Sequence, residues 1–275
     1  KIEEELRKIM PTFVKRASGE HGIAWSNYLR KVEQVKEAFP KGESGFAKRV
    51  DLVRVNGSEE DILAMTIVSS SNMTYEEAKK IAYSMPPGEK ESFFENFFSI
   101  RENRRHKPPR EFEEVRYTFE IVTNFGAYRD LQRHRMLTQF RQPLTPKLGY
   151  DVPQEIVDAG FEYKWERAME RARKLYEKMA KTNGHYAQYV LPFAYRARFF
   201  FTLTLREAFH LCELRSQPQG HPDYRSIAIA IADEIAKVHP NAGKMLFLNR
   251  DNISLERYEA EKRLENKRRI IHSRT

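Results

Sequence analysis

The sequence contains a single cysteine, Cys212, among its 275 residues. One thiol cannot form a disulfide within the chain or a cysteine-based zinc cluster, which is consistent with a reducing compartment. No stretch approaches the roughly 18–20 uncharged apolar residues of a membrane-spanning helix, and the start, KIEEE, lacks a secretory signal pattern. We therefore expect a soluble, cytoplasmic protein with no membrane partner. Because the chain does not begin with Met, we also expect it to be part of a longer protein.

The composition excludes a disordered chain and favours an anionic partner. Apolar residues make up 40% and aromatic residues 12%, enough for one large domain or two small ones. The 48 Lys and Arg exceed the 39 Asp and Glu, so the net charge is +9. This charge suits nucleotides, phosphorylated cofactors, nucleic acid or an acidic protein. Residues 128–147 carry five basic side chains against one acidic side chain.

The first hundred residues are predicted to be mainly helical. Apolar residues recur at helical spacing through the first 50 residues, and glycines interrupt them. Thr74 and Glu77 have the spacing of a capping box ahead of a short helix. The polar stretch 101–110 is expected to be a loop. We expect an N-terminal helical extension and the start of a domain over 1–100, a core over 101–250, and a basic helix or tail over 251–275.

Beyond residue 115 the pattern predicts two strands, each followed by a helix. Apolar and polar side chains alternate over 115–121 and again over 199–205, as in half-buried strands. Helices are predicted over 127–140 and 206–215, with further helices over 161–182 and from Pro222 to just before Pro240. This order indicates an α+β fold without a regular βαβ repeat.

The segment 132–143, QRHRMLTQFRQP, places Arg133 and Arg135 on either side of His134. Guanidinium groups suit phosphate oxygens and the carbonyl oxygens of a flavin or pyrimidine, although a solvated basic helix face is the alternative. Arg-His-Arg after a strand, followed by seven residues and a Ser, is the signature of the flavin-dependent thymidylate synthases, which this segment resembles. The resemblance continues through the strand YTFE before it and through 190–215, and covers about 113–240.

That resemblance implies an antiparallel sheet with long helices and a site built from several subunits, hence a homo-oligomer, either a tetramer or a tandem-domain dimer. In the family, FAD reduced by NADPH helps to transfer a methylene from methylenetetrahydrofolate to dUMP, giving dTMP without a protein nucleophile. Arginines are then the residues expected to position the anionic ligands and to polarise the uracil ring. Carried over by position, Arg133 and His134 would contact FAD, and Arg135 and Arg215 would bind dUMP and act in catalysis. The weaker candidates are Glu113, His106 and His210 for the cofactor, and Arg206 and Thr138 for the substrate.

The sequence departs from the signature at several polar positions. Pro143 stands where the family has Ser, and Phe140 and Arg141 stand where Asn and Glu are common. Thr204 and His210 replace asparagines. Each buried polar contact is worth ~1 kcal/mol or more, so losing several should weaken dUMP binding by orders of magnitude unless other contacts replace them. The FAD half of the site is better preserved than the dUMP half.

These departures leave three alternatives to an active enzyme. The chain could be a divergent flavin-binding relative, or a catalytically inactive half of a tandem protein. It could also be a basic nucleic-acid-binding module that uses 129–141 and 267–269, although nucleic acid is the less favoured partner because no such motif is present. Cys212 is expected to be a packed, inert thiol, and the sparse histidines predict no metal site. Thr138 could equally replace a family Ser or cap a backbone carbonyl.

Overall fold

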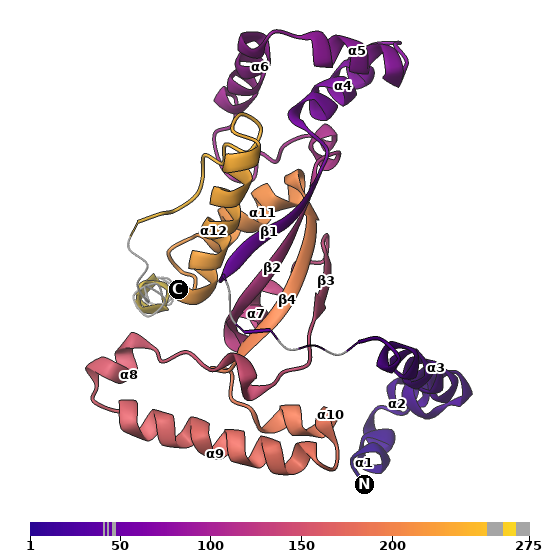
Figure 1. Cartoon of the computed structure of the whole chain (residues 1–275), viewed down its shortest axis with the longest axis vertical. Helices are drawn as coiled ribbons and strands as arrows, with labels where there is room; N and C mark the ends of the chain where they lie inside the picture. Colours follow the sequence, from indigo (N-terminus) through magenta and orange to yellow (C-terminus); the bar gives the residue numbers. More distant parts are fainter. Residues whose placement is uncertain (41, 43, 46–47, 252–260, 268–275) are drawn as a thin grey trace, which may run out of the picture. The chain divides into compact units, whose positions relative to one another are not determined.

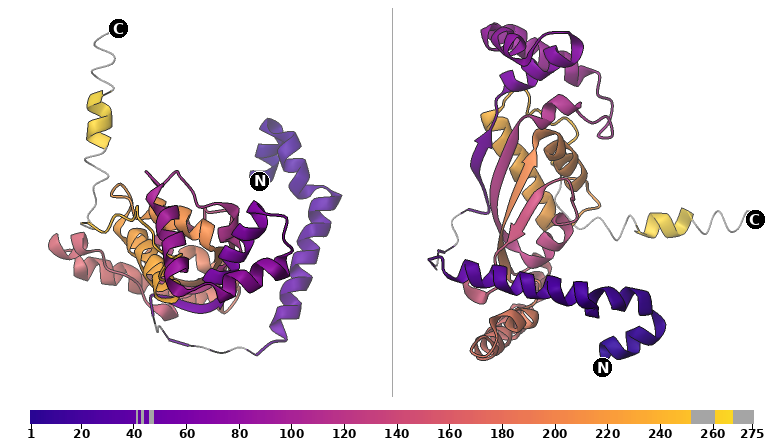
Figure 2. Two further views of the ribbon diagram at one scale, coloured as in Figure 1. Left: turned by 90° about the horizontal axis from the view of Figure 1, so that it is seen from above. Right: turned by 90° about the vertical axis from the view of Figure 1, so that its right-hand side faces the viewer.

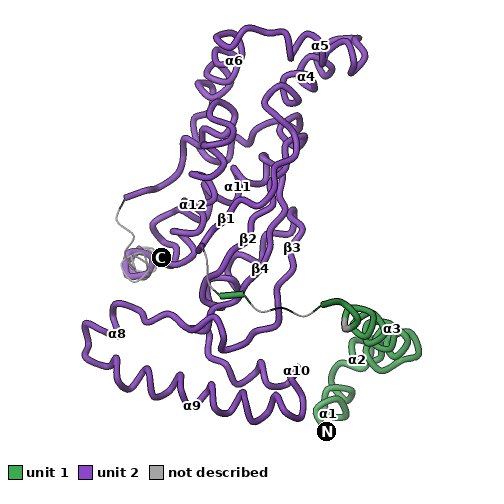
Figure 3. Tube along the Cα trace, in the orientation of Figure 1, with its two compact units in different colours: residues 1–45 green, residues 46–275 purple. Residues whose placement is uncertain are grey.

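The computed structural model describes residues 1–40, 42, 44–45, 48–251 and 261–267. The chain divides into two compact units, residues 1–45 and residues 46–275 (Figure 3). Among the described residues, no helix is long and apolar enough to cross a membrane.

The first unit is helical, as predicted. It consists of α1 (Ile2–Ile9), α2 (Pro11–Ser18) and α3 (Glu20–Glu37). Val14 is buried, whereas Ile9, Phe13 and Trp25 are exposed.

The second unit is built on a four-stranded antiparallel sheet. The strands are β1 (Val50–Asn56), β2 (Arg116–Asn124), β3 (Thr138–Arg141) and β4 (Arg196–Thr204), in the order β1-β2-β4-β3 (Figure 1). The two predicted strands are confirmed as β2 and β4, which lie side by side. The predicted α+β class and the antiparallel sheet are therefore confirmed.

Two helices cover one face of this sheet. They are α11 (Leu205–Arg215) and α12 (Pro222–Val238) (Figure 2). Both helices were predicted from the sequence and are confirmed. The strand residues beneath them are fully buried. Burying such a side chain stabilises the fold by about 1.5–3 kcal/mol, so this layer is the main core. Its strand residues are Tyr117, Phe119, Ile121, Phe199 and Phe201.

The segment between β1 and β2 is helical. It contains α4 (Glu59–Ser70), α5 (Tyr75–Ser84), α6 (Pro87–Ser99) and the 3-10 turn η1 (Arg110–Glu113). The predicted capping box is confirmed, because the Thr74 amide donates to Glu77 Oε2 at 2.9 Å and the Glu77 amide donates to Thr74 Oγ1 at 3.4 Å. Most of the polar stretch 101–110 is the loop between α6 and η1, as predicted.

A helical excursion separates β3 from β4. It contains η2 (Pro146–Leu148), α8 (Gln154–Asp158), α9 (Glu162–Ala180), α10 (Gly184–Ala187) and η3 (Gln188–Val190). The long helix predicted over 161–182 is confirmed as α9. Its apolar stripe is only partly covered, since Met169 is buried while Phe161 and Leu175 are exposed.

The helix predicted over 127–140 is wrong. The observed helix α7 (Phe125–Leu131) ends before the Arg-His-Arg triplet, and 138–141 form strand β3. Thr138 and Phe140 of β3 lie opposite Thr202 and Phe200 of β4. Pairing with this open sheet edge stabilises an extended segment of β-branched and aromatic residues over a helix.

The predicted C-terminal helix lies mostly outside the described residues. Residues 261–267 are helical and exposed, as predicted for a solvated helix. The remainder of the expected tail, including two of the three basic residues at 267–269, lies outside the described part.

Candidate functional site

The loop after α7 brings His134 into contact with two residues of α11. The His134 side chain is 4% exposed, and its Nδ1 lies 3.0 Å from Glu207 Oε1. On the other side of the ring, Arg215 Nε donates to Nε2 at 2.9 Å. Since 81 residues separate His134 from Arg215, this contact joins two distant parts of the sequence.

These partners define the tautomer of the neutral His134 ring. A guanidinium can only donate, so Nε2 must accept and carries no hydrogen. The ring proton of the neutral imidazole is therefore on Nδ1, which donates to the Glu207 carboxylate. His134 is held between a cation and an anion with both ring nitrogens satisfied.

The start of α11 favours a negative charge on Glu207, the residue that His134 Nδ1 contacts. The Thr204 hydroxyl caps this helix by accepting from the Glu207 amide at 3.2 Å. A carboxylate in the first turn of a helix is favoured by the helix dipole. His210 lies one turn further, with its ring 5.5 Å from that of His134. Burial lowers the pKa of His210, which favours a neutral ring near pH 7.

The Arg215 side chain is held by few contacts. Its guanidinium carbon lies 5.5 Å from the centre of the Tyr224 ring. Within the described part of the chain, its two terminal NH2 groups have no hydrogen-bond partner. His134 thus anchors Arg215 through Nε and leaves the terminal groups available to a ligand.

The arginines that flank His134 do not join this cluster. Arg133 and Arg135 are both exposed, and Arg133 forms an ion pair with Asp130 of α7. Arg135 has no partner among the residues that the structure describes. Thr138 is exposed on β3. Of the predicted site residues, the structure therefore brings together His134, Arg215 and His210. It leaves Arg133, Arg135 and Thr138 at the surface.

Arg206 and Glu113 form a separate pair. Arg206 Nη1 lies 3.3 Å from Glu113 Oε1, and its Nε donates to the Pro108 carbonyl at 2.7 Å. Nearby in the sequence, the exposed His106 accepts on its backbone carbonyl from Arg101 Nε at 2.7 Å. Neither His106 nor Glu113 has a hydrogen bond or ion pair with His134, Arg215 or His210 among the described residues.

Sequence reasoning missed the structural role of Arg101. It forms a buried two-point ion pair with Glu213 of α11, at 3.0 and 2.7 Å. Its guanidinium also lies between the rings of Phe209 and Phe247, 5.0 and 5.1 Å from their centres. Because 112 residues separate the two partners, no local pattern could have indicated the pair. It fixes the loop before η1 against the helix that carries Glu207 and Arg215.

Two of the positions that depart from the signature make packing contacts. The exposed Phe140 ring stacks on Phe200 with centres 5.3 Å apart. The Arg141 guanidinium lies 5.2 Å from the centre of the Phe125 ring and donates to the Gln142 carbonyl. Neither residue supplies the amide or the carboxylate that the signature has there.

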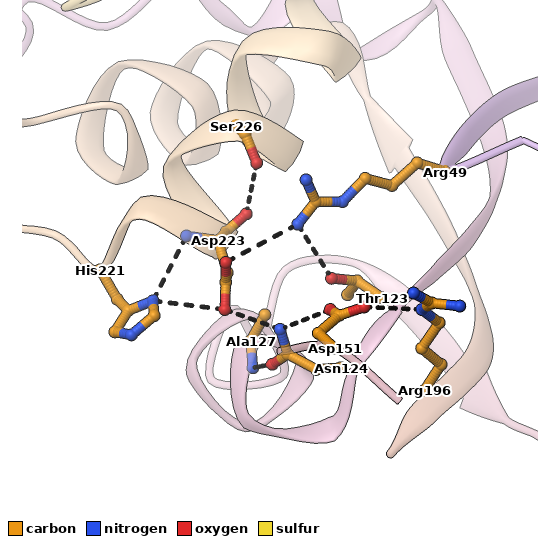
Figure 4. Close-up of polar contacts among 9 residues, drawn as sticks. All are labelled: Arg49, Thr123, Asn124, Ala127, Asp151, Arg196, His221, Asp223 and Ser226. Atoms are coloured by element: carbon orange, nitrogen blue, oxygen red, sulfur yellow. Dashed lines mark hydrogen bonds and ion pairs between the residues drawn. The ribbon is translucent and has the colours of Figure 1, made fainter. Parts of the chain in front are cut away.

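A pocket of about 950 Å³ lies where β2 ends and β4 begins. One of the residues that line it is Asn124, the last residue of β2, which is only 6% exposed. The Asn124 amide nitrogen donates to Asp151 Oδ2 at 3.0 Å and to Asp223 Oδ2 at 2.6 Å (Figure 4). Its oxygen accepts from the Ala127 amide at 2.8 Å and caps α7. One side chain thus joins β2, α7, α12 and the segment before α8.

The two carboxylates of this pocket have different surroundings. Asp151 accepts from Arg196 Nε at 2.6 Å, and its backbone carbonyl accepts from Trp165 Nε1 at 3.2 Å. Besides its hydrogen bond from Asn124, the Asp223 carboxylate has longer ion pairs within the described part of the chain, to Arg49 at 4.0 Å and to His221 at 3.5 Å. Sequence reasoning missed this group because Asn124 and Asp223 also have ordinary roles, at a strand end and a helix start.

Two further observations concern metals and the thiol. Among the described residues, no group of three or more His, Cys, Asp or Glu side chains is placed to hold a metal ion. Cys212 is buried, as expected for a packed thiol. Burial raises the pKa of Cys212, which favours the unreactive protonated form.

The fold resembles that of a solved enzyme. The structure of a UMP/dUMP methylase from Streptomyces cacaoi, bound with 5-Br dUMP, matches 73% of this chain and 95% of its own. The TM-score is 0.53 and the sequence identity is 17%.

The sequence comparisons are more specific. The UPF0159 protein of Chlamydia muridarum is 40% identical over 270 residues, which are 94% of this chain and 51% of that protein. The chain spans about half the length of the curated relatives that match it over most of its length. A flavin-dependent thymidylate synthase of Pyrococcus abyssi is 36% identical over 76 residues, 27% of this chain and 31% of that enzyme. The model of the thymidylate synthase complementing protein family matches residues 51–241, so the chain belongs to this family.

Proposed function

We propose that this chain binds FAD and a pyrimidine nucleotide and takes part in flavin-dependent methylation of dUMP to dTMP, with methylenetetrahydrofolate and NADPH as co-substrates. The observation that carries the proposal is the hydrogen bond between His134 and Arg215. It joins the two sequence blocks that resemble the flavin-dependent thymidylate synthases. The family match and the fold shared with a UMP/dUMP methylase support the same reaction class.

The exposed donors around this cluster fit an anionic cofactor. Arg135 has no partner in the described part of the chain, and Arg133 has only the surface pair with Asp130. Such guanidinium groups suit the diphosphate of FAD and the phosphate of dUMP. FAD would supply the hydride that reduces the transferred methylene group. We propose that Arg133 contributes contacts to the FAD diphosphate and that Arg135 binds the dUMP phosphate, with His134 setting the position of the loop that carries them.

Arg215 is proposed to act on the pyrimidine. Its anchored Nε fixes the plane of the guanidinium, and the terminal NH2 groups can donate to a uracil carbonyl oxygen. Donors placed where negative charge develops stabilise the transition state without reorganisation. Glu207 holds the His134 proton on Nδ1, which keeps Nε2 an acceptor for Arg215. Glu207 is thus a positioning residue for Arg215.

A tritium-release assay with 5-tritiated dUMP, FAD, NADPH and methylenetetrahydrofolate tests the proposal. We expect turnover in the native chain and a loss of 100-fold or more for Arg215→Ala, as is usual when a transition-state donor is removed. The matched control is Arg171→Ala, an exposed arginine of α9, which should keep full turnover. Equal rates in the two variants would remove Arg215 from the reaction.

The half-length match favours a second candidate, a tandem protein in which this chain supports an active half. Pro143, Phe140 and Arg141 lack the polar groups of the signature, which is the pattern of a degenerate copy. In the longer protein, Arg215→Ala in this half should then leave turnover unchanged. Under the main proposal, the same substitution abolishes turnover.

The proposal includes self-assembly and a cytoplasmic location. Sites of the resembled family combine residues of several subunits, so two or more copies of the chain would be needed. Light scattering on the purified protein tests this, with a mass above 32.5 kDa expected.

A further inference from the structure

We infer that Arg225 and Asn249 are positioning residues for Arg215, because together they hold the end of α11, where Arg215 lies. The inference rests on the function proposed above, which gives Arg215 its role on the pyrimidine. Asn249 belongs to residues 247–251, which we call the return segment. The return segment lies beyond the stretch 51–241 that the family model matches, so it is a feature of this chain that the family match does not include.

The end of α11 depends on bonds from outside the helix. Arg215 is the last residue of α11, and the final carbonyl groups of a helix have no partner within it. Helix ends fray where nothing else bonds to these carbonyls. In this chain, Gln217 Nε2 donates to the Glu213 carbonyl at 2.8 Å. The Ser216 carbonyl accepts from Arg225 Nε at 3.0 Å. These bonds fix the last turn of α11 and the residue that follows it.

Arg225 joins the end of α11 to the return segment. It lies near the start of α12 and is completely buried. Its Nη2 donates to Asn249 Oδ1 and to the Asp251 carbonyl, both at 3.0 Å. A guanidinium presents its donors in one rigid plane. The bonds of Arg225 to Ser216, Asn249 and Asp251 therefore hold these three residues in one relative position.

The return segment also bonds directly to the end of α11. The Asn249 amide donates to the buried Ser216 Oγ at 3.2 Å. The Phe247 carbonyl accepts from Gln217 Nε2 at 3.2 Å. Leu248, between these two residues, packs against the main core. Because a buried network of satisfied hydrogen bonds is rigid, the end of α11 has a fixed support.

This support reaches the Arg215 side chain in two ways. Arg215 directly precedes Ser216, so a shift of the Ser216 backbone moves the bond from Arg215 Nε to His134 Nε2, which is 2.9 Å long. Tyr224 directly precedes Arg225, and its ring centre lies 5.5 Å from the Arg215 guanidinium carbon. Displacing a group that acts in a reaction by about 1 Å can cost roughly 100-fold in rate. Side chains that lock such a group from behind are thus part of the working site.

Asn249→Ala tests the inference in the whole chain. It removes one acceptor of Arg225 at a residue that is only half-buried, so we expect the variant to fold. In the tritium-release assay, kcat/KM for dUMP should fall roughly 10- to 100-fold. FAD affinity should stay within twofold of the native value. Asn249→Asp keeps the acceptor oxygen and should recover most of the loss. The matched control is Asn96→Ala, on an exposed residue of α6, which should leave both values unchanged.

Arg225→Lys tests the planar guanidinium itself. Lysine keeps the positive charge but presents its donors from a single nitrogen, so it cannot hold the three acceptors as arginine does. We expect a loss of kcat/KM at least as large as in Asn249→Ala. Urea unfolding shows whether this variant is folded, and Asn249→Ala provides the test if it is not.

Nitrogen NMR of histidine-labelled protein reports on Arg215 without turnover. The Nε2 resonance of His134 depends on the hydrogen bond from Arg215 Nε, and His134→Gln assigns the signal. We expect Asn249→Ala to shift this resonance towards its position in Arg215→Ala. Asn249→Asp should keep the native position. If Asn249 and Arg225 only stabilised the fold, their variants would lower the urea midpoint and leave the resonance unmoved.

The inference is overturned if folded Asn249→Ala keeps both the native dUMP kinetics and the native His134 resonance. Failure of the proposed function looks different, because the native chain itself would then neither bind nor turn over dUMP. In that case the His134 resonance alone decides whether the return segment positions Arg215. A shifted resonance would support the positioning role, and an unshifted one would refute it.

Discussion

The second unit contains two polar clusters, each organised by one nearly buried side chain that joins distant segments. Around His134, the imidazole nitrogens are satisfied by Glu207 and Arg215. Around Asn124, the central amide is equally satisfied, but Oδ1 of Asp223 accepts no hydrogen bond from the residues that the structure describes. The first cluster thus positions a cation, whereas the second holds groups that can still form hydrogen bonds. Satisfied buried networks give rigidity, and unused groups at a pocket wall give recognition.

The largest expected loss of stability comes from breaking the His134 cluster. Glu207→Ala leaves the His134 Nδ1–H buried without an acceptor, which should lower the free energy of unfolding by about 1–3 kcal/mol. Glu207→Gln keeps an acceptor oxygen and should recover at least half of the loss. Urea unfolding measures both variants. A loss below 0.5 kcal/mol in Glu207→Ala would show that this cluster is not a rigid support.

Asn124→Ala should cost slightly less, about 0.5–2 kcal/mol, because it removes the cap of α7. It also removes the donor between two carboxylates. Asn124→Ser keeps a capping oxygen and should restore part of the stability. The same unfolding measurement applies, and a larger loss than in Glu207→Ala would reverse the ranking of the two clusters.

Acid should weaken the His134 cluster. Burial lowers the pKa of His210, and the charges of Lys107 and Arg104 act in the same direction. A group with a lowered pKa in the folded state stabilises the protein above its unfolded pKa, about 6.5, and this stability is lost as pH falls through the folded pKa. We expect the urea concentration at the unfolding midpoint to decrease as the pH is lowered from 7.5 to 5.5. His210→Gln should make the urea midpoint depend less on pH. An unchanged pH dependence in this variant would assign the acid sensitivity to other groups.

The smallest effect on stability is expected at the surface arginine of the signature. Arg133→Ala breaks an exposed ion pair with Asp130, which is worth at most about 1 kcal/mol. We expect an unfolding free energy within 0.5 kcal/mol of the native value but at least tenfold weaker FAD binding. Unchanged FAD affinity would restrict Arg133 to a surface role.

Much of the fold could be predicted from local sequence patterns. Alternation identified β2 and β4, and helical spacing identified α9, α11 and α12. The error at 127–140 arose because β3 is stabilised by its pairing with β4, which no local pattern contains. Residues 138–141 do carry β-branched and aromatic side chains, but four residues are too few for a reliable period.

The candidate site could be predicted only through the two sequence blocks that resemble the flavin-dependent thymidylate synthases. His134 and Arg215 were predicted to be site residues by resemblance, and the structure places them in contact. Their buried partner Glu207 was missed because a carboxylate on a helix is ordinarily a surface residue. The Asn124 pocket was missed because its partners come from four separate segments, which only the folded chain brings together.

Titration of the purified chain with FAD, followed by flavin absorbance and fluorescence, tests the central claim most directly. We expect saturable binding with a shifted flavin spectrum, and binding that is at least tenfold weaker in Arg133→Ala. An unshifted spectrum at saturating FAD, in protein whose circular dichroism is that of the folded chain, would contradict it.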